Sequence, residues 1–284
     1  MPRPFRFGVN LLTPASAGEW RAKCRRAEEL GYDVILVPDH LGMPAPFPAL
    51  VAAAGATERP RLGTFVLNAG FWNPTLLARE VATTAALTGG RLELGLGTGY
   101  VQAEHDRAGL PFGSPRERVD HLRRTVEELR KSDECRVPLL IGGNGDRMLR
   151  LTAEHADIAA FTGARLVPDS TEGRLEPISA AELDERVGRY GEFAADRAEA
   201  AERNLLIQLV AVTEDPGPVL APILGRRPEL TPERALALPI VLVGTLEELV
   251  ARVRGLRERY GISYLTVLEP SMEALAPVIA ALSA

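Results

Sequence analysis

The sequence predicts one α/β domain over residues 1–284, a (β/α)8 or TIM barrel in which eight parallel strands close on themselves inside a ring of helices. Short runs rich in Val, Ile, Leu and Phe alternate with longer stretches of helical period, which is the pattern of repeated βα units. Each short run is almost continuously apolar, as is typical of parallel strands buried on both faces. The alternative architecture with this pattern is an open, doubly wound sheet.

Eight segments fit this description of a strand, and a stretch of helical period follows each of them. In chain order, the predicted strands are Phe5–Leu11, Asp33–Val37, Arg61–Asn68, Arg91–Gly97, Val137–Ile141, Asp157–Phe161, Leu205–Thr213 and Ile262–Leu268. Their carboxyl ends should meet at one face of the barrel, the face where enzymes of this architecture carry their chemistry.

Capping signals bound several of the predicted helices. A capping residue stands directly before proline, or three residues before glutamate, at Asn73–Pro74, Ser114–Pro115 and Thr245–Glu248. Glycine follows two of the helical stretches, at Gly31 and Gly261, where a helix must end before the next strand begins.

Two connections are too long to be simple turns. Gly163–Ser179, after the sixth predicted strand, is polar and lacks periodicity, so it is predicted to be a mobile loop. Glu214–Pro239, after the seventh, is rich in proline and contains two short apolar pieces, Val219–Leu224 and Ala235–Leu238. Both follow the carboxyl ends of strands, so they are either lids over a site or surface excursions without a function.

Composition and charge limit the classes of partner. The net charge of -5 at pH 7 gives no broad positive field for nucleic acid or an anionic membrane, and no segment is apolar for long enough to span a bilayer. The first residues lack the apolar core of a signal peptide, and the two cysteines, Cys24 and Cys135, cannot build a disulfide framework. We therefore expect a cytoplasmic protein that acts on a small molecule.

Small and polar residues follow most of the predicted strands. They are Asn10, Asp39, His40, Leu67, Asn68, Gly97, Thr98, Gly99, Tyr100, Gly142, Gly143, Asn144, Gly145, Thr162 and Gly163. Because the strands are parallel, these residues should converge on one rim, where glycines let a ligand approach the backbone and polar side chains orient it.

The turn Gly142–Gly145 ends the fifth predicted strand and opens a helix. The first amides of a helix are unpaired and partly positive, so this turn is a candidate phosphate seat, to which Arg147 could add a charged contact. The alternative interpretation is a tight strand-to-helix turn that needs glycine only for its geometry. The run Gly95–Tyr100 superficially resembles a dinucleotide fingerprint, but Tyr100 occupies the third glycine position and no helix plainly starts there, which argues against that fold.

His40 is the histidine best placed for proton chemistry, because it follows the second predicted strand with Asp39 beside it. The other three are weaker candidates: His105 is expected on an exposed loop, His121 on a helix, and His155 on the face opposite the predicted site. None is paired at metal-ligand spacing, so no metal is predicted. The sequence has no Gly-x-Ser-x-Gly elbow for nucleophilic hydrolysis. A pair of strand-end carboxylates for a glycosidase is not evident either, and only Glu214 and Glu269 keep that class open.

Several motifs together resemble the luciferase-like superfamily of flavin and deazaflavin enzymes. These motifs are Gly63–Asn68, Asn73–Glu80, Gly89–Gly99, Pro38–His40, Ala108–Phe112, and Leu140–Gly145 with Ala153–Asp157. They cover about the first 160 residues. Within the superfamily, the Asp39-His40 pair and the Gly-Thr-Gly ending look most like the reductases that use the deazaflavin coenzyme F420.

This resemblance implies roles for the strand-end residues. The deazaflavin ring would lie in the barrel mouth on a bulge formed by Val66, Leu67 and Asn68, which in such enzymes often contains a non-prolyl cis peptide. Asp39 and His40 would be catalytic residues beside the ring. The cofactor would also contact Gly97, Thr98, Gly99 and Tyr100, and its phosphate would contact Gly142, Gly143, Asn144, Gly145, Arg147 and Thr162.

One departure from the family lies before the fifth predicted strand. Residues 130–137 stand where relatives usually carry a longer segment with a β-hairpin. The substrate pocket should therefore be more open, or be shaped by other loops or by a partner subunit. The resemblance implies such a partner, because a homodimer is expected from the family.

Three functions fit the resemblance: hydride transfer with F420, monooxygenation with reduced FMN, or a flavin-binding barrel without turnover. A deazaflavin does not support the oxygen chemistry of reduced FMN, so the identity of the bound cofactor separates the first two.

Overall fold

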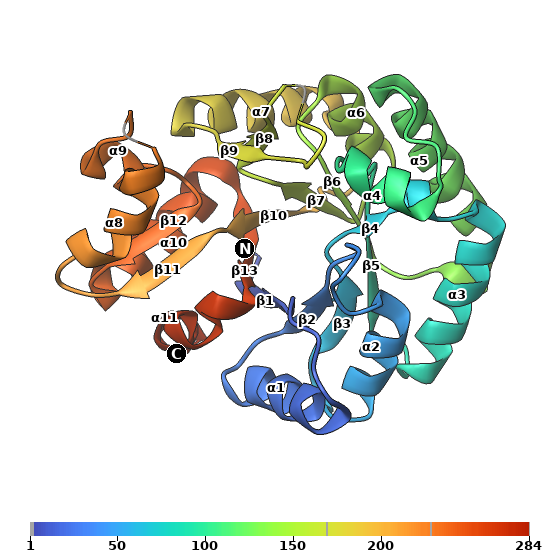
Figure 1. Ribbon diagram of the computed structural model, residues 1–284, viewed down its shortest axis with the longest axis horizontal. Coiled ribbons are helices and arrows are strands. Elements are labelled where there is room, and N and C mark those ends of the chain that lie inside the picture. The colour runs from blue at the N-terminus through green and yellow to red at the C-terminus, as the bar shows by residue number, and fades with distance from the viewer. Residues whose placement is uncertain (1–2, 169, 228, 284) are drawn as a thin grey trace.

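A closed barrel of parallel strands lies at the centre of the computed structural model, which describes residues 3–168, 170–227 and 229–283 (Figure 1). Neighbouring strands follow the order β3-β2-β1-β13-β10-β7-β6-β5, and β5 pairs with β3 to close the barrel. The barrel strands are β1 Arg6–Asn10, β2 Val34–Val37, β3 Arg61–Thr64, β5 Leu92–Gly97, β6 Leu139–Gly142, β7 Ile158–Phe161, β10 Glu202–Ile207 and β13 Ile262–Leu268. The predicted eight-stranded barrel is confirmed, and the open sheet is wrong.

Helices form a ring outside these strands (Figure 1). They are α1 Ala17–Glu29, α2 Pro46–Ala54, α3 Pro74–Leu87, α5 Pro115–Leu129, α6 Asp146–His155, α7 Ala180–Phe193, α10 Leu246–Tyr260 and α11 Met272–Ser283. The predicted caps at Asn73, Ser114 and Thr245 each accept a hydrogen bond from a backbone amide of the first helical turn. Gly31 and Gly261 follow α1 and α10 with φ angles of 86° and 69°, the left-handed region that glycine adopts without steric cost.

The third predicted strand, Arg61–Asn68, is interrupted. It forms β3 and the two-residue strand β4 (Leu67–Asn68), which pairs with the end of β5 through Leu67 and Leu96. Between them lies a cis peptide bond, Phe65–Val66, at the position of the expected bulge. A short 3-10 helix, η1 (Ala69–Phe71), follows β4 directly.

The seventh predicted strand, Leu205–Thr213, is wrong in its extent. Its first part belongs to β10, whose register with β13 ends at Ile207 and Val267. The chain then turns at Gln208 and continues as β11 (Leu209–Val212), which leaves the barrel and pairs in parallel with β12 (Val241–Gly244). β12 is absent from the predicted strands. The apolar run predicted as one strand forms parts of two, β10 and β11, which pair with β13 and β12 respectively.

The two long connections contain regular structure. Gly163–Ser179, predicted as a loop without periodicity, forms an antiparallel hairpin of β8 (Ala164–Leu166) and β9 (Leu175–Pro177), so that prediction is wrong. Glu214–Pro239 contains two helices, α8 (Gly217–Arg226) and α9 (Pro232–Leu236). The apolar piece Val219–Leu224 lies within α8, whereas Ala235–Leu238 begins in α9 and extends two residues beyond it. Figure 1 shows α8, α9, β11 and β12 projecting to one side of the barrel. The segment between α5 and β6 contains a single 3-10 helix, η2 (Asp133–Cys135).

The interior of the barrel is apolar around Tyr264 and charged at the amino ends of the strands. A layer of apolar side chains surrounds Tyr264, and includes Val34, Leu36, Leu140 and Ile158. At the amino ends of the strands lies a charged cluster, in which Arg6 pairs with Glu93 and Glu202. In the described part of the chain, no helix is both long and apolar enough to cross a membrane.

Candidate active site

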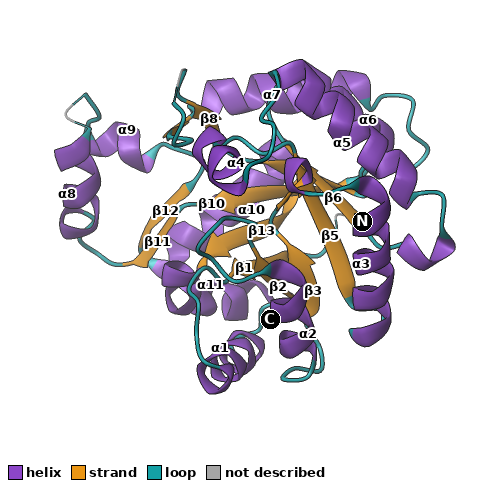
Figure 2. Ribbon diagram, turned by 45° about the vertical axis from the view of Figure 1, so that its right-hand side comes forward, coloured by secondary structure: helices purple, strands orange, loops and turns teal. Residues whose placement is uncertain are grey.

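The carboxyl ends of the barrel strands all open onto one face of the molecule. A short helix, α4 (Gln102–Ala108), lies over this face beside the β8–β9 hairpin (Figure 2). The hairpin contacts the start of α4, where the amide of Ala103 donates to the carbonyl oxygen of Thr171 at 3.2 Å. Parallel strands in a closed barrel deliver their polar ends to this mouth, so it is the place to look for chemistry.

Asp39 lies at the mouth with its carboxylate tied to the bulge. Its Oδ2 accepts hydrogen bonds from the backbone amide of Asn68 and from the indole Nε1 of Trp72, both at 3.1 Å. Burial raises the pKa of Asp39, and these two hydrogen bonds oppose the shift. The carboxylate therefore anchors β4 and η1 against the end of β2.

His40 is half-buried beside Asp39, and its partner is an acidic residue that the sequence analysis missed. The imidazole Nδ1 lies 3.0 Å from both carboxylate oxygens of Glu104, which also accepts from the amide of Leu41 at 3.2 Å. Because a carboxylate only accepts, Nδ1 carries the proton and Nε2 is left facing away from Glu104. The ring of Tyr100 packs edge-on against the imidazole at 5.7 Å, and burial raises the pKa of that phenol.

The presence of α4, which carries Glu104, shows that two predictions are wrong. No helix is predicted directly after Gly97–Tyr100, yet α4 begins at Gln102. His105 is predicted on an exposed loop, whereas it is a helical residue with 1% of its surface exposed. The helix was missed because it is only seven residues long and its first turn has no side-chain cap, so none of the usual start signals precedes it.

Glycines at the end of β5 fit closely against the bulge. A Cβ on Gly97 would lie 2.8 Å from Cγ2 of Val66, and a Cβ on Gly99, whose φ is 71°, would lie 2.2 Å from the side chain of Asn68. Leu67 is fully buried beneath them, and Thr98 is half-buried with its hydroxyl 3.4 Å from the carbonyl oxygen of Gly99. The structure thus brings the bulge and the Gly-Thr-Gly ending together.

The turn Gly142–Gly145 leads into α6 as predicted. Gly145 is the N-cap residue, so no capping side chain accepts a hydrogen bond from the first amides of the helix. Asn144 donates from Nδ2 to the hydroxyl of Thr162 at 2.8 Å, while its Oδ1 is buried with no partner among the described residues. A Cβ on Gly143, whose φ is 155°, would lie 3.1 Å from the side chain of Met148.

The arginine expected at this turn lies elsewhere. Arg147 is half-exposed and pairs with Asp120 at 2.6 Å, so the structure does not bring it to the glycines. Arg186 of α7 reaches the turn instead, donating to the carbonyl oxygen of Asn144 at 3.4 Å and to Asp146 at 3.2 Å. No motif marks Arg186 in the sequence, because α7 follows the turn by some 35 residues.

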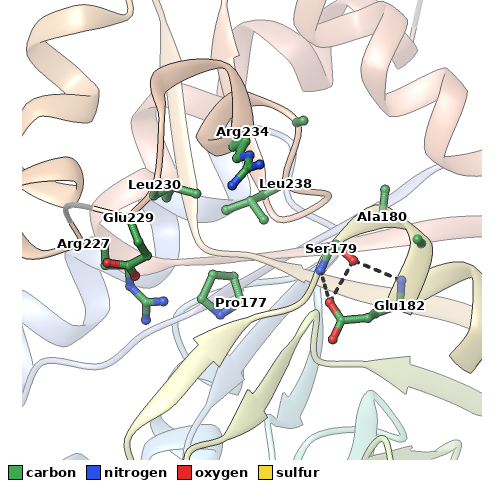
Figure 3. Close-up of a pocket in the computed structure, with 11 residues that line it drawn as sticks. Pro177, Ser179, Ala180, Glu182, Arg227, Glu229, Leu230, Arg234 and Leu238 are labelled. Atoms are coloured by element: carbon green, nitrogen blue, oxygen red, sulfur yellow. Dashed lines mark hydrogen bonds between the residues drawn. The ribbon is translucent and has the colours of Figure 1, made fainter.

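A groove of about 530 Å³ lies beside the mouth, between the start of α7 and the segment that carries α9. Figure 3 shows Ser179 and Glu182 on one side of it and Arg227 and Glu229 on the other. Ser179 and Glu182 cap each other, so the first helical turn of α7 already has its side-chain acceptor. None of the predicted site residues lines this groove, whereas they do converge at the barrel mouth. We therefore take the mouth, with its fixed polar side chains, as the candidate active site.

Comparisons with known proteins agree with this architecture. A family model described as luciferase-like monooxygenase matches residues 3–263. The F420-dependent glucose-6-phosphate dehydrogenase of Intrasporangium calvum is 38% identical over 117 residues, which cover 37% of this chain and 35% of that protein. The 5,10-methylenetetrahydromethanopterin reductase of Archaeoglobus fulgidus is 28% identical over 171 residues, 54% of this chain and 51% of that protein.

The chain therefore spans about a third to a half of the length of the curated relatives it matches. Among solved structures, an F420-dependent secondary alcohol dehydrogenase in complex with an F420-acetone adduct superposes with a TM-score of 0.76. It is 17% identical, and the match covers 99% of each chain. At that identity the likeness shows the fold alone.

Proposed function

Because the chain belongs to the luciferase-like monooxygenase family of oxidoreductases, we propose that it transfers hydride between coenzyme F420 and a small organic substrate. The observation that carries the proposal is the His40–Glu104 pair at the barrel mouth, beside the bulge that packs closely against Gly97 and Gly99. The names of the matched relatives favour F420 over FMN as the cofactor.

The residues at the mouth fit such a cofactor. Asn10 ends β1 with 4% of its surface exposed, and its Oδ1 has no hydrogen-bond partner among the described residues. The Oδ1 of Asn144, on the other side of the mouth, is also buried without a hydrogen-bond partner among the described residues. Buried acceptors without donors are costly, and a deazaflavin with a ribityl chain carries the N–H and O–H groups that would satisfy them. When bound, F420 would supply a hydride donor or acceptor at C5 of its ring.

His40 would move the proton that accompanies the hydride. Its Nδ1–H is held by Glu104, so its Nε2 lone pair can take a proton from an alcohol, and the imidazolium can return a proton to a carbonyl oxygen. The carboxylate of Glu104 fixes the imidazole tautomer and the orientation of the ring. Asp39, whose accepting oxygen is already shared by two N–H donors, would hold the bulge in place and not exchange protons.

The cofactor can be identified directly. The protein should be purified from a host that makes deazaflavins, and the co-purifying molecule identified by its fluorescence and mass. We expect F420, and titration of the cofactor-free protein should show tighter binding of F420 than of FMN. Tighter binding of FMN, with oxygen-dependent turnover, would replace the proposal by monooxygenation. Binding of F420 without hydride exchange to any alcohol or carbonyl would indicate a barrel that does not turn over.

His40→Asn tests the proton-transfer role. It should leave the Kd for F420 within a few-fold of the wild type and lower turnover by about 10²-fold or more, the range typical of a lost general acid or base. His155→Asn is the matched control, since His155 lies at the end of α6 on the opposite face. Unchanged turnover in His40→Asn would remove His40 from the mechanism.

A further inference from the structure

His105 is a buried imidazole whose two nitrogens are both engaged. Nδ1 lies 2.9 Å from the carbonyl oxygen of Pro111, and Nε2 lies 3.0 Å from Nδ2 of Asn68. A carbonyl oxygen only accepts, so Nδ1 carries the proton and Nε2 accepts from the amide of Asn68. The orientation of that amide is fixed independently, because its Oδ1 accepts from the backbone N–H of Gly70 at 3.0 Å.

The imidazole fits closely among its neighbours. The rings of Phe71 and Phe112 pack against it with centroid distances of 4.9 and 5.1 Å. A Cβ on Gly70 would lie 2.5 Å from Cε1 of the imidazole, so the backbone of η1 approaches as closely as it can. The position of His105 therefore determines where Asn68 can lie.

His105 completes a closed circuit of contacts around the mouth. Asn68 donates from its backbone to Asp39, Asp39 is followed by His40, His40 bonds to Glu104, and Glu104 is followed by His105. Two covalent steps and three hydrogen bonds thus connect the end of β2, the strand β4 and the helix α4. A closed circuit restricts each member more than an open chain of the same bonds, because no member can move without displacing two others.

We propose that His105 is a positioning residue, which holds the His40–Glu104 pair and the bulge in one fixed arrangement through its hydrogen bond to Asn68. The inference rests on the proposed function for its kinetic consequence, but the positioning itself is a property of the cofactor-free protein. His105 is buried and both of its nitrogens are bonded, so it does not exchange protons with a substrate.

The test compares His105→Phe with His105→Gln. Phenylalanine keeps a flat ring between Phe71 and Phe112 but removes both hydrogen bonds. Glutamine carries one donor and one acceptor at a spacing similar to the two imidazole nitrogens, so it should restore the contacts to Pro111 and Asn68. His155→Phe, on the opposite face, controls for the loss of a histidine.

The first measurement needs no cofactor. The chain has 4 histidines, so long-range ¹H–¹⁵N spectra can assign every ring from single substitutions. In the wild type, His40 and His105 should both be Nδ1–H tautomers. We expect His105→Phe to convert His40 to a mixture of tautomers, and His105→Gln and His155→Phe to leave it unchanged. A single Nδ1–H tautomer of His40 in a folded His105→Phe protein would overturn the proposal.

The second measurement is kinetic. Displacement of the proton-transfer group by about 1 Å is enough to slow turnover by up to 10²-fold, so we expect kcat of His105→Phe to fall at least about tenfold while the Kd for F420 stays within about threefold. His105→Gln should recover most of that loss. A parallel loss of cofactor affinity and kcat in both variants would indicate a purely structural role. If the wild type proves inactive with F420, the proposed function fails, but the spectra still decide the positioning role.

Discussion

Replacement of Arg6 by methionine should leave two buried carboxylates without their shared cation. Arg6 begins β1 inside the barrel and donates to Glu202 at 2.5 Å and to Glu93 at 2.7 Å. The side chains of Glu93 and Glu202 are 2% and 7% exposed, so water cannot replace the guanidinium. Arg61 remains 3.2 Å from Glu93. Among the described residues, only Arg6 forms an ion pair with Glu202.

The expected cost follows from this burial. Removal of one partner from a buried ion pair destabilises a protein by about 3–5 kcal/mol, because it strands the other charge in a medium of low polarity. At about 2–4 °C per kcal/mol for a chain of this size, Arg6→Met should lower Tm by roughly 6–20 °C. Methionine preserves much of the side-chain volume, so a cavity adds little.

The loss should depend on pH with a definite sign. Burial raises the pKa of Glu202 in the wild type, and Arg6 opposes that shift. Without Arg6 the carboxyl group of Glu202 takes up a proton more readily in the folded state, and once protonated it no longer carries the stranded charge. The deficit in Tm should therefore be larger at pH 7 than at pH 5.

Thermal unfolding followed by circular dichroism at both pH values tests this. Arg26→Met is the control, because Arg26 pairs with Glu273 on the surface, where such pairs contribute less than about 1 kcal/mol. The double variant Arg6→Met/Glu202→Gln should recover much of the lost Tm at pH 7. A Tm for Arg6→Met as high as that of the control, or no recovery in the double variant, would refute the reasoning.

Three further substitutions probe the barrel mouth. Glu104→Leu should slow turnover by about 10²-fold with the Kd for F420 within a few-fold, because the imidazole loses its orienting acceptor; steady-state kinetics and cofactor titration measure both. Gly97→Ala should weaken cofactor binding about tenfold or more, because the new Cβ meets Val66 at 2.8 Å, while Gly188→Ala, which has open space around it, should not alter the titrated Kd. Asp39→Asn should unfold at the same temperature as the wild type near pH 4 and at a higher temperature at pH 7: burial raises the pKa of Asp39, so the wild type gains stability only while the carboxyl group stays protonated and loses it as pH rises.

The sequence was sufficient for the barrel because its signals are local. Most barrel strands are short, mainly apolar runs, and caps such as Asn73 and Thr245 are recognisable within four residues. The errors arise where a segment depends on a distant partner. β8 and β9 are three residues each, and they pair across the hairpin through one ion pair, Arg165–Glu176, between two apolar pairs, a pattern too short to show periodicity. β11 and β12 lie on either side of a proline-rich stretch, and nothing in either run indicates that it pairs outside the barrel.

The candidate site divides in the same way. Asp39 and His40 follow a predicted strand, so their place at the mouth could be predicted from topology. Glu104 and His105 could not, because both lie on a helix of seven residues whose first turn has no side-chain cap. The burial of His105 depends further on Phe71, which lies 34 residues before it in the sequence.

Helix geometry explains how two adjacent residues serve two different strand ends. Successive side chains on an α-helix point about 100° apart, so neighbours on one short helix face different directions. In α4, Glu104 faces His40 at the end of β2, and His105 faces Asn68 in β4. A single turn of helix laid across parallel strand ends can therefore connect two of them, provided that consecutive positions carry groups able to hydrogen-bond. The adjacent pair Glu104-His105 is the local pattern that carries this arrangement in the sequence. The two residues stand seven and eight positions after Gly97, where the Gly-Thr-Gly ending begins.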